Sequence, residues 1–401
     1  MWPQLGGLAE RRVLVVAAAL AVAQGAAGEE RAPACDNPAP AIAAVGVARN
    51  QEVAAAVRRL ASLVEEERQR TGLASVAVGV VHDRTVLFAG GFGCANLARR
   101  LPATPDTLYR IGSVTKLFEA TALMQQRDAG RLALDDPVER SVPGISLLGP
   151  DGERVSPTWR QLASHTAGLP RNLRPGIGTV ADLLHFLERE IALSVPGTRY
   201  AYSNLGFVVL GQALAQLAGE GYQSYVHGHL FEPLGMASST YNPETVDPDR
   251  LAVGYLRVER SAAAWSGYAA GYRGPFMPSG AMLSTVNDMN RFLIAQFGTA
   301  PILSPRSIRE MWQPVAPTGS SGDAAAIGWF TSRLGPYTVV RKDGGQPGFT
   351  AFVQIIPERK VGMVVLVNES PERVRASDFG RLDGLILELL LPPITRASAA
   401  R

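Results

Sequence analysis

Segments typical of β-strands are concentrated at the two ends of this 401-residue chain. Near the start, ASVAVGVVH and TVLFAGG are short apolar runs around a turn at His82-Asp83. Near the end, AIGWFTSRL, YTVVRK, TAFVQIIP and VGMVVLVN are separated by GP, GGQPG and PERK turns. Strands that are this short and closely spaced pair as hairpins, so we expect an antiparallel sheet to which both ends of the chain contribute.

Helical patterns occupy most of the chain between about residues 115 and 300, and they also flank the strands. The segment VTKLFEATALMQQRDAG predicts a helix that ends at Gly130, a residue suited to a helix C-terminus. SDFGRLDGLILELLL predicts a closing helix, and QEVAAAVRRLASLVEEERQR predicts an opening one. The apolar face of that opening helix comprises Val53, Val57, Leu60 and Val64. The simplest architecture is an α/β (α+β) fold, with an antiparallel sheet flanked by terminal helices and an inserted, mostly helical domain.

The first 28 residues have the pattern of an export signal. Arg11 and Arg12 precede the apolar run VLVVAAALAVA, and the small residues of QGAAGEE follow, where cleavage before Glu29 fits the pattern. The apolar run is short for a membrane span, although an uncleaved anchor is the alternative. We therefore expect an exported protein, either periplasmic or secreted.

The chain is expected to contain one folded domain, residues 51–395. The predicted ranges are a signal peptide 1–28, a flexible Ala- and Pro-rich lead-in 29–50, a sheet lobe 51–112 with 301–395, and a helical lobe 113–300. The two cysteines, Cys35 and Cys94, could pair in an oxidising compartment or remain two inert thiols.

Lysine is rare in this chain: only Lys116, Lys342 and Lys360 occur among 39 basic residues. Lys116 follows Ser113 by three residues at the start of a helical pattern, so the two side chains can share one helix face. The field of a helix N-terminus stabilises an alkoxide and lowers the pKa of a neighbouring amine. A neutral lysine can accept the proton of a serine, whereas an arginine stays charged. The alternative is a surface lysine on the first helical turn.

Two further segments contain candidate site residues. In GTRYAYSNLGF, Tyr202 could move protons beside a cationic lysine, and Asn204 could hold a substrate amide or merely cap the following helix. In VVRKDGGQPGFT, Lys342 is followed by Gly344 and Gly345, where glycine lets a substrate approach backbone N–H groups. The alternative for this second segment is a glycine-rich hairpin turn beside a surface lysine.

Taken together, SVTK, YSN and KDG resemble, in the expected order, the three motifs of the serine β-lactamase and penicillin-binding protein superfamily. The most similar branch contains class C β-lactamases, D-alanyl-D-alanine carboxypeptidases and related esterases. The phrases LALDDPVERSVP, LASHTAGLP, FEPLGM, PSGAMLSTVNDMNRFL and GGQPGF are similar too, so the resemblance covers roughly residues 50–390. It implies a β-lactamase/transpeptidase-like fold and an exported serine hydrolase that acts on an ester or amide, including D-amino-acid peptides or β-lactams.

The resemblance also implies roles for the candidate residues. Ser113 would form the acyl-enzyme, Lys116 and Tyr202 would share the general-base role, and the N–H groups of Ser113 and Gly345 would form the oxyanion hole. Asn204 would orient the acyl amide of the substrate. Lys342 would supply positive potential, and no metal or organic cofactor is implied.

Asp343 departs from the family pattern, which usually has a hydroxyl residue at this position to help hold a substrate carboxylate. A negative charge there disfavours binding of a substrate carboxylate unless Asp343 turns away or pairs with an arginine. Asp343 therefore favours an esterase or amidase over an enzyme that hydrolyses penicillins strongly. The same departure favours the alternative hypothesis of a catalytically weak or inactive fold that acts as a peptidoglycan-binding or scaffold protein.

Other classes of function find little support in the sequence. The net charge of +3 and the absence of a basic run argue against a nucleic-acid partner. His165 in SHTAGLP is expected to be structural, and the His227 and His229 pair lacks a carboxylate-spaced partner for a metal. The aromatic segment 264–278 could line a substrate cleft or simply pack as a loop.

Overall fold

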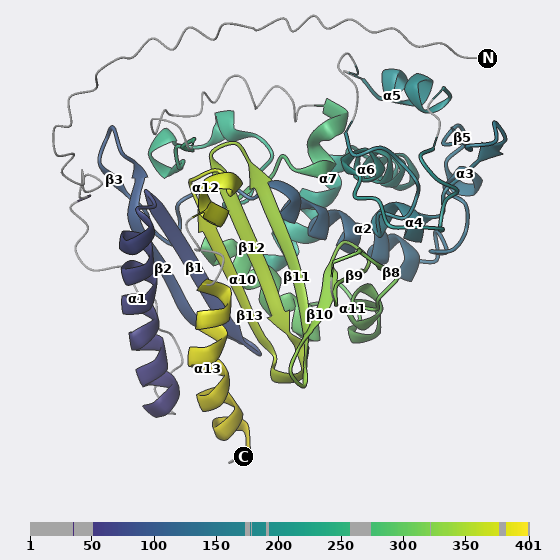
Figure 1. The fold of residues 1–401 in the computed structure, drawn as a ribbon. Coiled ribbons are helices and arrows are strands. Elements are labelled where there is room, and N and C mark those ends of the chain that lie inside the picture. The colour runs from purple at the N-terminus through teal and green to yellow at the C-terminus, as the bar shows by residue number, and fades with distance from the viewer. Residues whose placement is uncertain are drawn as a thin grey trace, which may run out of the picture. The chain divides into compact units, whose positions relative to one another are not determined.

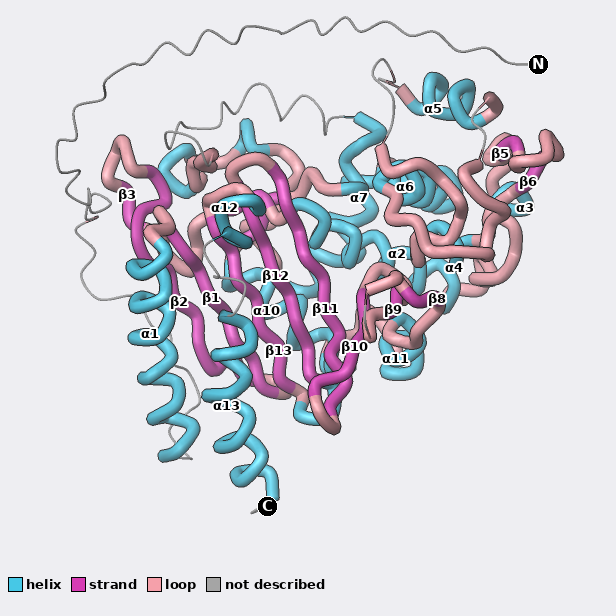
Figure 2. The backbone as a smooth tube through the Cα atoms, in the orientation of Figure 1, coloured by secondary structure: helices cyan, strands magenta, loops and turns pink. Residues whose placement is uncertain are grey.

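The computed structural model describes residues 35, 51–172, 177, 179–189, 192–256, 274–320, 322–376 and 382–399. The predicted signal peptide, nearly all of the lead-in and most of segment 264–278 lie outside these described residues. Figure 2 shows the longer strands gathered in one sheet, with helices on both of its faces.

In the described part of the chain the main sheet has nine strands, and every neighbouring pair is antiparallel. From edge to edge the order is β3 (Leu101–Pro102), β2 (Thr85–Asn96), β1 (Ser75–His82), β13 (Val361–Val367), β12 (Phe349–Ile356), β11 (Tyr337–Gln346), β10 (Phe330–Leu334), β9 (Ala324–Ala325) and β8 (Ala316–Pro317). In the central pair, Val76 of β1 lies opposite Val367 of β13. The two ends of the chain therefore meet in the middle of the sheet, which confirms the predicted architecture.

One face of the sheet is covered by the terminal helices α1 (Gln51–Thr71) and α13 (Leu382–Ala399), which lie side by side (Figure 1). The four residues predicted to form the apolar face of α1 are all buried there. Along β1, Val76, Val78 and Val80 belong to this core, whereas Ala77 and Val81 belong to the core on the opposite face. This alternation explains why β1 is apolar at nearly every position: both of its faces are buried.

The opposite face is covered by the helices between β4 and β8, with α10 (Val286–Ile294) directly against β1 and β13. Behind it lie α2 (Lys116–Asp128) and α6 (Asn204–Ala218), which pack on each other. The remaining helices are α3 (Val138–Ser141), α4 (Trp159–Ala163), α5 (Val180–Leu187), α7 (Tyr222–Val226), α8 (Glu232–Leu234), α11 (Pro305–Met311) and α12 (Pro371–Ala376). Two small ladders lie outside the main sheet: β4 (Tyr109–Arg110) with β7 (Leu283–Ser284), and β5 (Leu147–Leu148) with β6 (Arg154–Val155).

The predicted GGQPG turn is too long. Strand β11 continues through Gln346, because Gly344 and Gly345 stay paired with Ala351 and Thr350 of β12, and only Pro347 and Gly348 form the turn. The interpretation of these glycines as a hairpin turn is therefore wrong. They lie within a strand, next to the turn that contains Ser113.

Cys35 and Cys94 form a disulfide, with their Cα atoms 5.5 Å apart. The bond attaches Cys35 to strand β2, a pairing that the sequence left open. In the described ranges, no helix is both long enough and apolar enough to cross a membrane.

Candidate active site

Ser113 lies in a 3-10 turn, η2 (Gly112–Thr115), that leads directly into α2. Lys116 is the first residue of α2 and is fully buried, and its Nζ lies 3.3 Å from Ser113 Oγ. The same amine is 2.9 Å from Asn204 Oδ1 and donates to the carbonyl oxygen of Ser279. The structure therefore places the predicted serine and lysine within hydrogen-bonding distance, at the N-terminal end of a helix.

Glycines let strand β11 approach the Ser113 turn closely. Gly112 has a φ of +50°, and a Cβ there would lie 2.7 Å from the backbone nitrogen of Gly345. A Cβ on Gly344 would lie 2.0 Å from the carbonyl oxygen of Ile111, which no side chain could tolerate. The backbone of Gly345 thus adjoins the Ser113 turn, an arrangement compatible with the predicted pair of N–H donors.

Tyr202 and Asn204 reach the site from the start of α6. Tyr202 Oη donates a hydrogen bond of 2.8 Å to Ser113 Oγ. Ser203, not Asn204, caps the helix, because its Oγ accepts from the N–H of Gly206 at 2.8 Å. The interpretation of Asn204 as a cap is therefore wrong: its amide bridges Lys116 and the Oδ1 of Asn172.

Lys342 points from β11 into the same site and is fully buried. Its Nζ lies 5.2 Å from the centre of the Tyr202 ring and 4.6 Å from that of Phe330. Among the described residues, this amine has no hydrogen-bond partner. All of the residues that the sequence singled out for the site thus meet around one serine hydroxyl.

Burial changes the acid–base properties of both lysines. Desolvation lowers the pKa of Lys116 to about 7; the Glu119 carboxyl group partly offsets this, and the positive charge of Arg171 adds to it. Desolvation lowers the pKa of Lys342 to about 8, and repulsion from Lys116 contributes. About half of the Lys116 amine is therefore neutral near pH 7, so it can accept a proton from Ser113.

Glu119 is a buried carboxyl group behind Lys116, one helical turn further along α2. Neither of its oxygens has a hydrogen-bond partner among the described residues, and a Cβ on Gly211 of α6 would lie 2.7 Å from Oε1. Burial raises the pKa of this carboxyl group well above its usual value, against the attraction of Lys116. Sequence reasoning missed this residue, although its spacing of three from Lys116 places the two side chains on one helix face.

His165 supports the Tyr202 segment. Its Nδ1 accepts the N–H of Ser203 at 3.1 Å, and its ring stacks on that of Tyr202 with centres 4.2 Å apart. Burial, together with the charges of Lys342 and Lys116, lowers the pKa of the imidazole well below its usual value, so it is neutral. These contacts fit the structural role that we expected for His165.

Asp343 is paired with an arginine, one of the two conditions under which it would not repel a substrate carboxylate. Arg341 Nη1 lies 3.1 Å from Asp343 Oδ2, and Arg341 Nη2 lies 2.6 Å from Asp323 Oδ2. Along β11, Lys342 is buried and its neighbour Asp343 is exposed, so the two side chains lie on opposite sides of the strand.

Sequence reasoning also missed two residues just beyond the phrase LASHTAGLP. The carbonyl oxygen of Arg171 accepts the N–H of Asn204 at 2.7 Å, and its guanidinium carbon lies 4.9 Å from the centre of the Tyr202 ring. Asn172 receives a hydrogen bond from the Asn204 side chain. Both residues follow a proline in a segment without helix or strand, where no periodicity could indicate their position.

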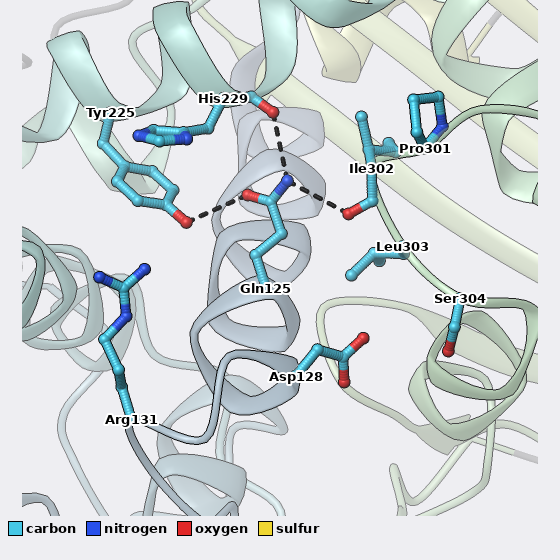
Figure 3. Close-up of a pocket in the computed structure, with 9 residues that line it drawn as sticks. All are labelled: Gln125, Asp128, Arg131, Tyr225, His229, Pro301, Ile302, Leu303 and Ser304. Atoms are coloured by element: carbon cyan, nitrogen blue, oxygen red, sulfur yellow. Dashed lines mark hydrogen bonds between the residues drawn. The ribbon is translucent and has the colours of Figure 1, made fainter.

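A separate hollow lies at the far end of α2, nine residues or about 14 Å along the helix from Lys116 (Figure 3). Gln125 occupies its centre, donating to the carbonyl oxygens of His229 and Ile302 and accepting from the hydroxyl group of Tyr225. These groups hold α2, α7 and the 301–304 segment together. The hollow contains none of the predicted site residues.

Metal ligands do not cluster in the part of the chain that the structure describes. His227 lies 3.2 Å from Glu232, and His229 lies 3.0 Å from Glu220, so each belongs to a separate pair.

Comparisons with known proteins identify relatives. A family model described as Beta-lactamase matches residues 60–385. A human protein named putative beta-lactamase-like 1 is 31% identical over 331 residues, which cover 78% of this chain and 64% of that protein, slightly less than two thirds of it. The D-alanyl-D-alanine-carboxypeptidase/endopeptidase AmpH of Escherichia coli is 30% identical over 294 residues, which cover 66% of this chain and 72% of that protein. The solved structure of an octameric penicillin-binding protein homologue from Pyrococcus abyssi superposes with a TM-score of 0.68 at 29% identity, covering 79% of this chain and 74% of that one.

Proposed function

Because this chain belongs to the beta-lactamase family, we propose that it is an exported serine hydrolase that cleaves esters or amides through an acyl-Ser113 intermediate. The observation that supports this most directly is the convergence of Tyr202 Oη and Lys116 Nζ on Ser113 Oγ, at 2.8 and 3.3 Å. A hydroxyl group with two potential proton acceptors, one of them a half-neutral amine, is an activated nucleophile.

The proposed reaction begins when Ser113 Oγ attacks the substrate carbonyl carbon. The hydroxyl proton moves to neutral Lys116, directly or through Tyr202, and the oxyanion faces the N–H groups of Ser113 and Gly345. The bond to the leaving alcohol or amine then breaks, and that group takes the proton from Lys116 or Tyr202. Water attacks the resulting acyl-Ser113 with the same groups as base, which releases the acid and restores the serine hydroxyl.

Asn204 and Lys342 have supporting roles in the proposed mechanism. The Asn204 amide is a donor and an acceptor beside Lys116, which suits an acyl amide of the substrate. Lys342 keeps a positive charge near Tyr202 and the developing oxyanion. The Cys35–Cys94 disulfide supports the proposed export, because such bonds persist mainly in oxidising compartments.

The substrate class can be tested with a panel that compares an activated ester, a D-alanyl-D-alanine peptide and a penicillin. We expect turnover of the ester to exceed that of the penicillin, because Asp343 replaces the usual hydroxyl residue. If purified protein releases product from none of the three, the catalytically inactive alternative is favoured, and Asp343 is the residue that motivates it.

The first prediction concerns pH. Lys116 acts as a base only in its neutral form, and its pKa is lowered to about 7, so kcat/KM is expected to fall below pH 7. The decrease should approach tenfold per pH unit on the acidic side. A profile of kcat/KM for an activated ester from pH 5 to 9 would measure it. A rate that stayed flat down to pH 5 would contradict the proposed role of Lys116.

The second prediction concerns Glu119→Gln. The Glu119 carboxyl group raises the pKa of Lys116, and the other ionisable groups beside the amine among the described residues include Arg171, Lys342, Tyr202 and the neutral His165. Replacing this carboxyl group with an amide, which cannot carry a negative charge, is therefore expected to move the acidic limb of the profile to lower pH. The exposed Glu139→Gln serves as a matched control that leaves the limb in place. A shift to higher pH would contradict this account.

A further inference from the structure

Three cations surround the ring of Tyr202. Lys116, Lys342 and Arg171 lie 5.4, 5.2 and 4.9 Å from its centre. All three charges also lower the pKa of the buried His165 imidazole. A site with this much positive charge attracts anionic ligands.

Arg171 differs from the two lysines in being exposed. Lys116 is already bonded to Ser113, Asn204 and the carbonyl group of Ser279. The guanidinium of Arg171, in contrast, forms no hydrogen bond or ion pair with any other described residue, and it lies over the Tyr202 ring. It therefore presents a planar fork of donors that matches the two oxygens of a carboxylate.

The backbone on both sides of Arg171 is attached to the YSN segment. Ser203 Oγ donates to the carbonyl oxygen of Pro170 at 2.6 Å, and the carbonyl oxygen of Arg171 accepts from Asn204 at 2.7 Å. The Asn204 side chain holds Asn172 at 2.8 Å. These bonds fix Arg171 on the Asn204 side of the nucleophile, where the proposed mechanism places the acyl part of the substrate.

Three carboxyl groups near the site, among the described residues, do not neutralise Arg171. Asp343 and Asp323 are paired with Arg341, and Glu119 is fully buried behind Lys116. We propose that Arg171 is a specificity-determining residue that binds a carboxylate on the acyl part of the substrate, so that esters or amides of acidic acyl groups are preferred. This inference rests on the proposed function, because the acyl side is defined by the proposed attack of Ser113.

The test compares two esters that differ in one charge: the 4-nitrophenyl monoester of glutaric acid and its neutral counterpart, 4-nitrophenyl methyl glutarate. After subtraction of spontaneous hydrolysis, wild-type kcat/KM is expected to be higher for the charged ester. Arg171→Met should lower the charged-to-neutral ratio about 10- to 100-fold, the range for a hydrogen-bonded charge pair. The ratio is the quantity compared because Arg171 also lowers the pKa of Lys116, an effect that both esters share. Arg171→Lys, which keeps the charge but loses the fork, should give an intermediate ratio.

Arg84→Met is the matched control. Arg84 is exposed in the turn that follows β1. The site lies at the opposite end of that strand, because Gly345 is connected to Val76 of β1 through the paired residues Thr350 and Val367. The two ends of β1 are about 20 Å apart, so this control should leave the ratio unchanged. If the charged-to-neutral ratio of Arg171→Met lies within about twofold of the wild-type ratio, the inference is overturned.

A binding measurement separates this inference from the proposed function. Calorimetric titration of the Ser113→Ala variant with each ester reports affinity without turnover. Tighter binding of the charged ester that is lost in Ser113→Ala/Arg171→Met supports the carboxylate site even if the wild type hydrolyses neither ester. Equal affinities for the two esters overturn it, whatever the rates show.

Discussion

Lys116→Arg is expected to lower kcat/KM for an activated ester by about a thousandfold, within the range of general-base catalysis. Arginine keeps a positive charge at this position but cannot lose its proton at any working pH, so it cannot take the proton of Ser113. A purely structural lysine would tolerate this substitution far better. Steady-state kinetics at pH 8, where wild-type Lys116 is mostly neutral, would measure the loss.

Lys360→Arg is the control for this substitution. Lys360 lies in the turn before β13 and is exposed, with its Nζ 3.0 Å from Asp83 at the end of the sheet remote from Ser113. Its replacement should leave kcat/KM unchanged. Because Lys116 is fully buried, circular dichroism and thermal unfolding must show that Lys116→Arg is folded. A folded Lys116→Arg variant with more than about a tenth of wild-type activity would contradict the assignment of Lys116 as a base.

Ser113→Ala is expected to reduce turnover of the same ester by at least about ten-thousandfold, towards the spontaneous rate. The substitution removes the nucleophile, and neither Tyr202 nor Lys116 could form an acyl intermediate of comparable reactivity in its place. The fold should be nearly unaffected, because the lost hydroxyl group accepts only two hydrogen bonds, each contributing about 1 kcal/mol. In a stopped-flow experiment, the variant should also show no initial burst of product, because no acyl-enzyme forms.

Residual activity of the Ser113→Ala variant would be informative. A Ser113→Ala protein that retained a tenth of wild-type turnover would require another nucleophile. Activity that disappeared together with the thermal transition would instead indicate unfolding, and Ser113→Gly would then be the variant to compare.

The sheet was predictable from the sequence because its central strands are buried on both faces and therefore apolar throughout, as in β1 and β13. The length of β11 was not, because its glycines satisfy a tertiary requirement. Gly344 is needed where the strand passes the carbonyl oxygen of Ile111, and local sequence gives the same signal for a turn.

The candidate site was predictable where residues act in short, ordered motifs. Ser113 and Lys116 are related by one helical turn, so their proximity follows from the spacing alone. Arg171 could not be predicted in this way. Glu119 follows Lys116 by three residues and Arg341 precedes Asp343 by two, so both contacts fit the local spacing, but no motif marked Glu119 or Arg341. The role of Arg171 depends on which segments meet in space, and a loop arginine over a tyrosine ring leaves no periodic signal.

The scarcity of lysine acquires a physical explanation in this account. Two of the three lysines are fully buried at the site, where desolvation lowers their pKa values, and the third is exposed at the opposite end of the sheet. An amine that must exchange a proton cannot be replaced by a guanidinium, whereas a surface cation can. The chain uses lysine where the proposed chemistry needs a titratable cation.

The most direct test of the central claim, that Ser113 is an activated nucleophile, is intact-protein mass spectrometry after exposure to a fluorophosphonate. The wild type should gain the mass of one phosphonyl group, peptide mapping should place it on Ser113, and Lys116→Arg should be labelled far more slowly. A wild-type protein that gains no mass, or a Ser113→Ala variant that is labelled as readily as the wild type, would contradict it.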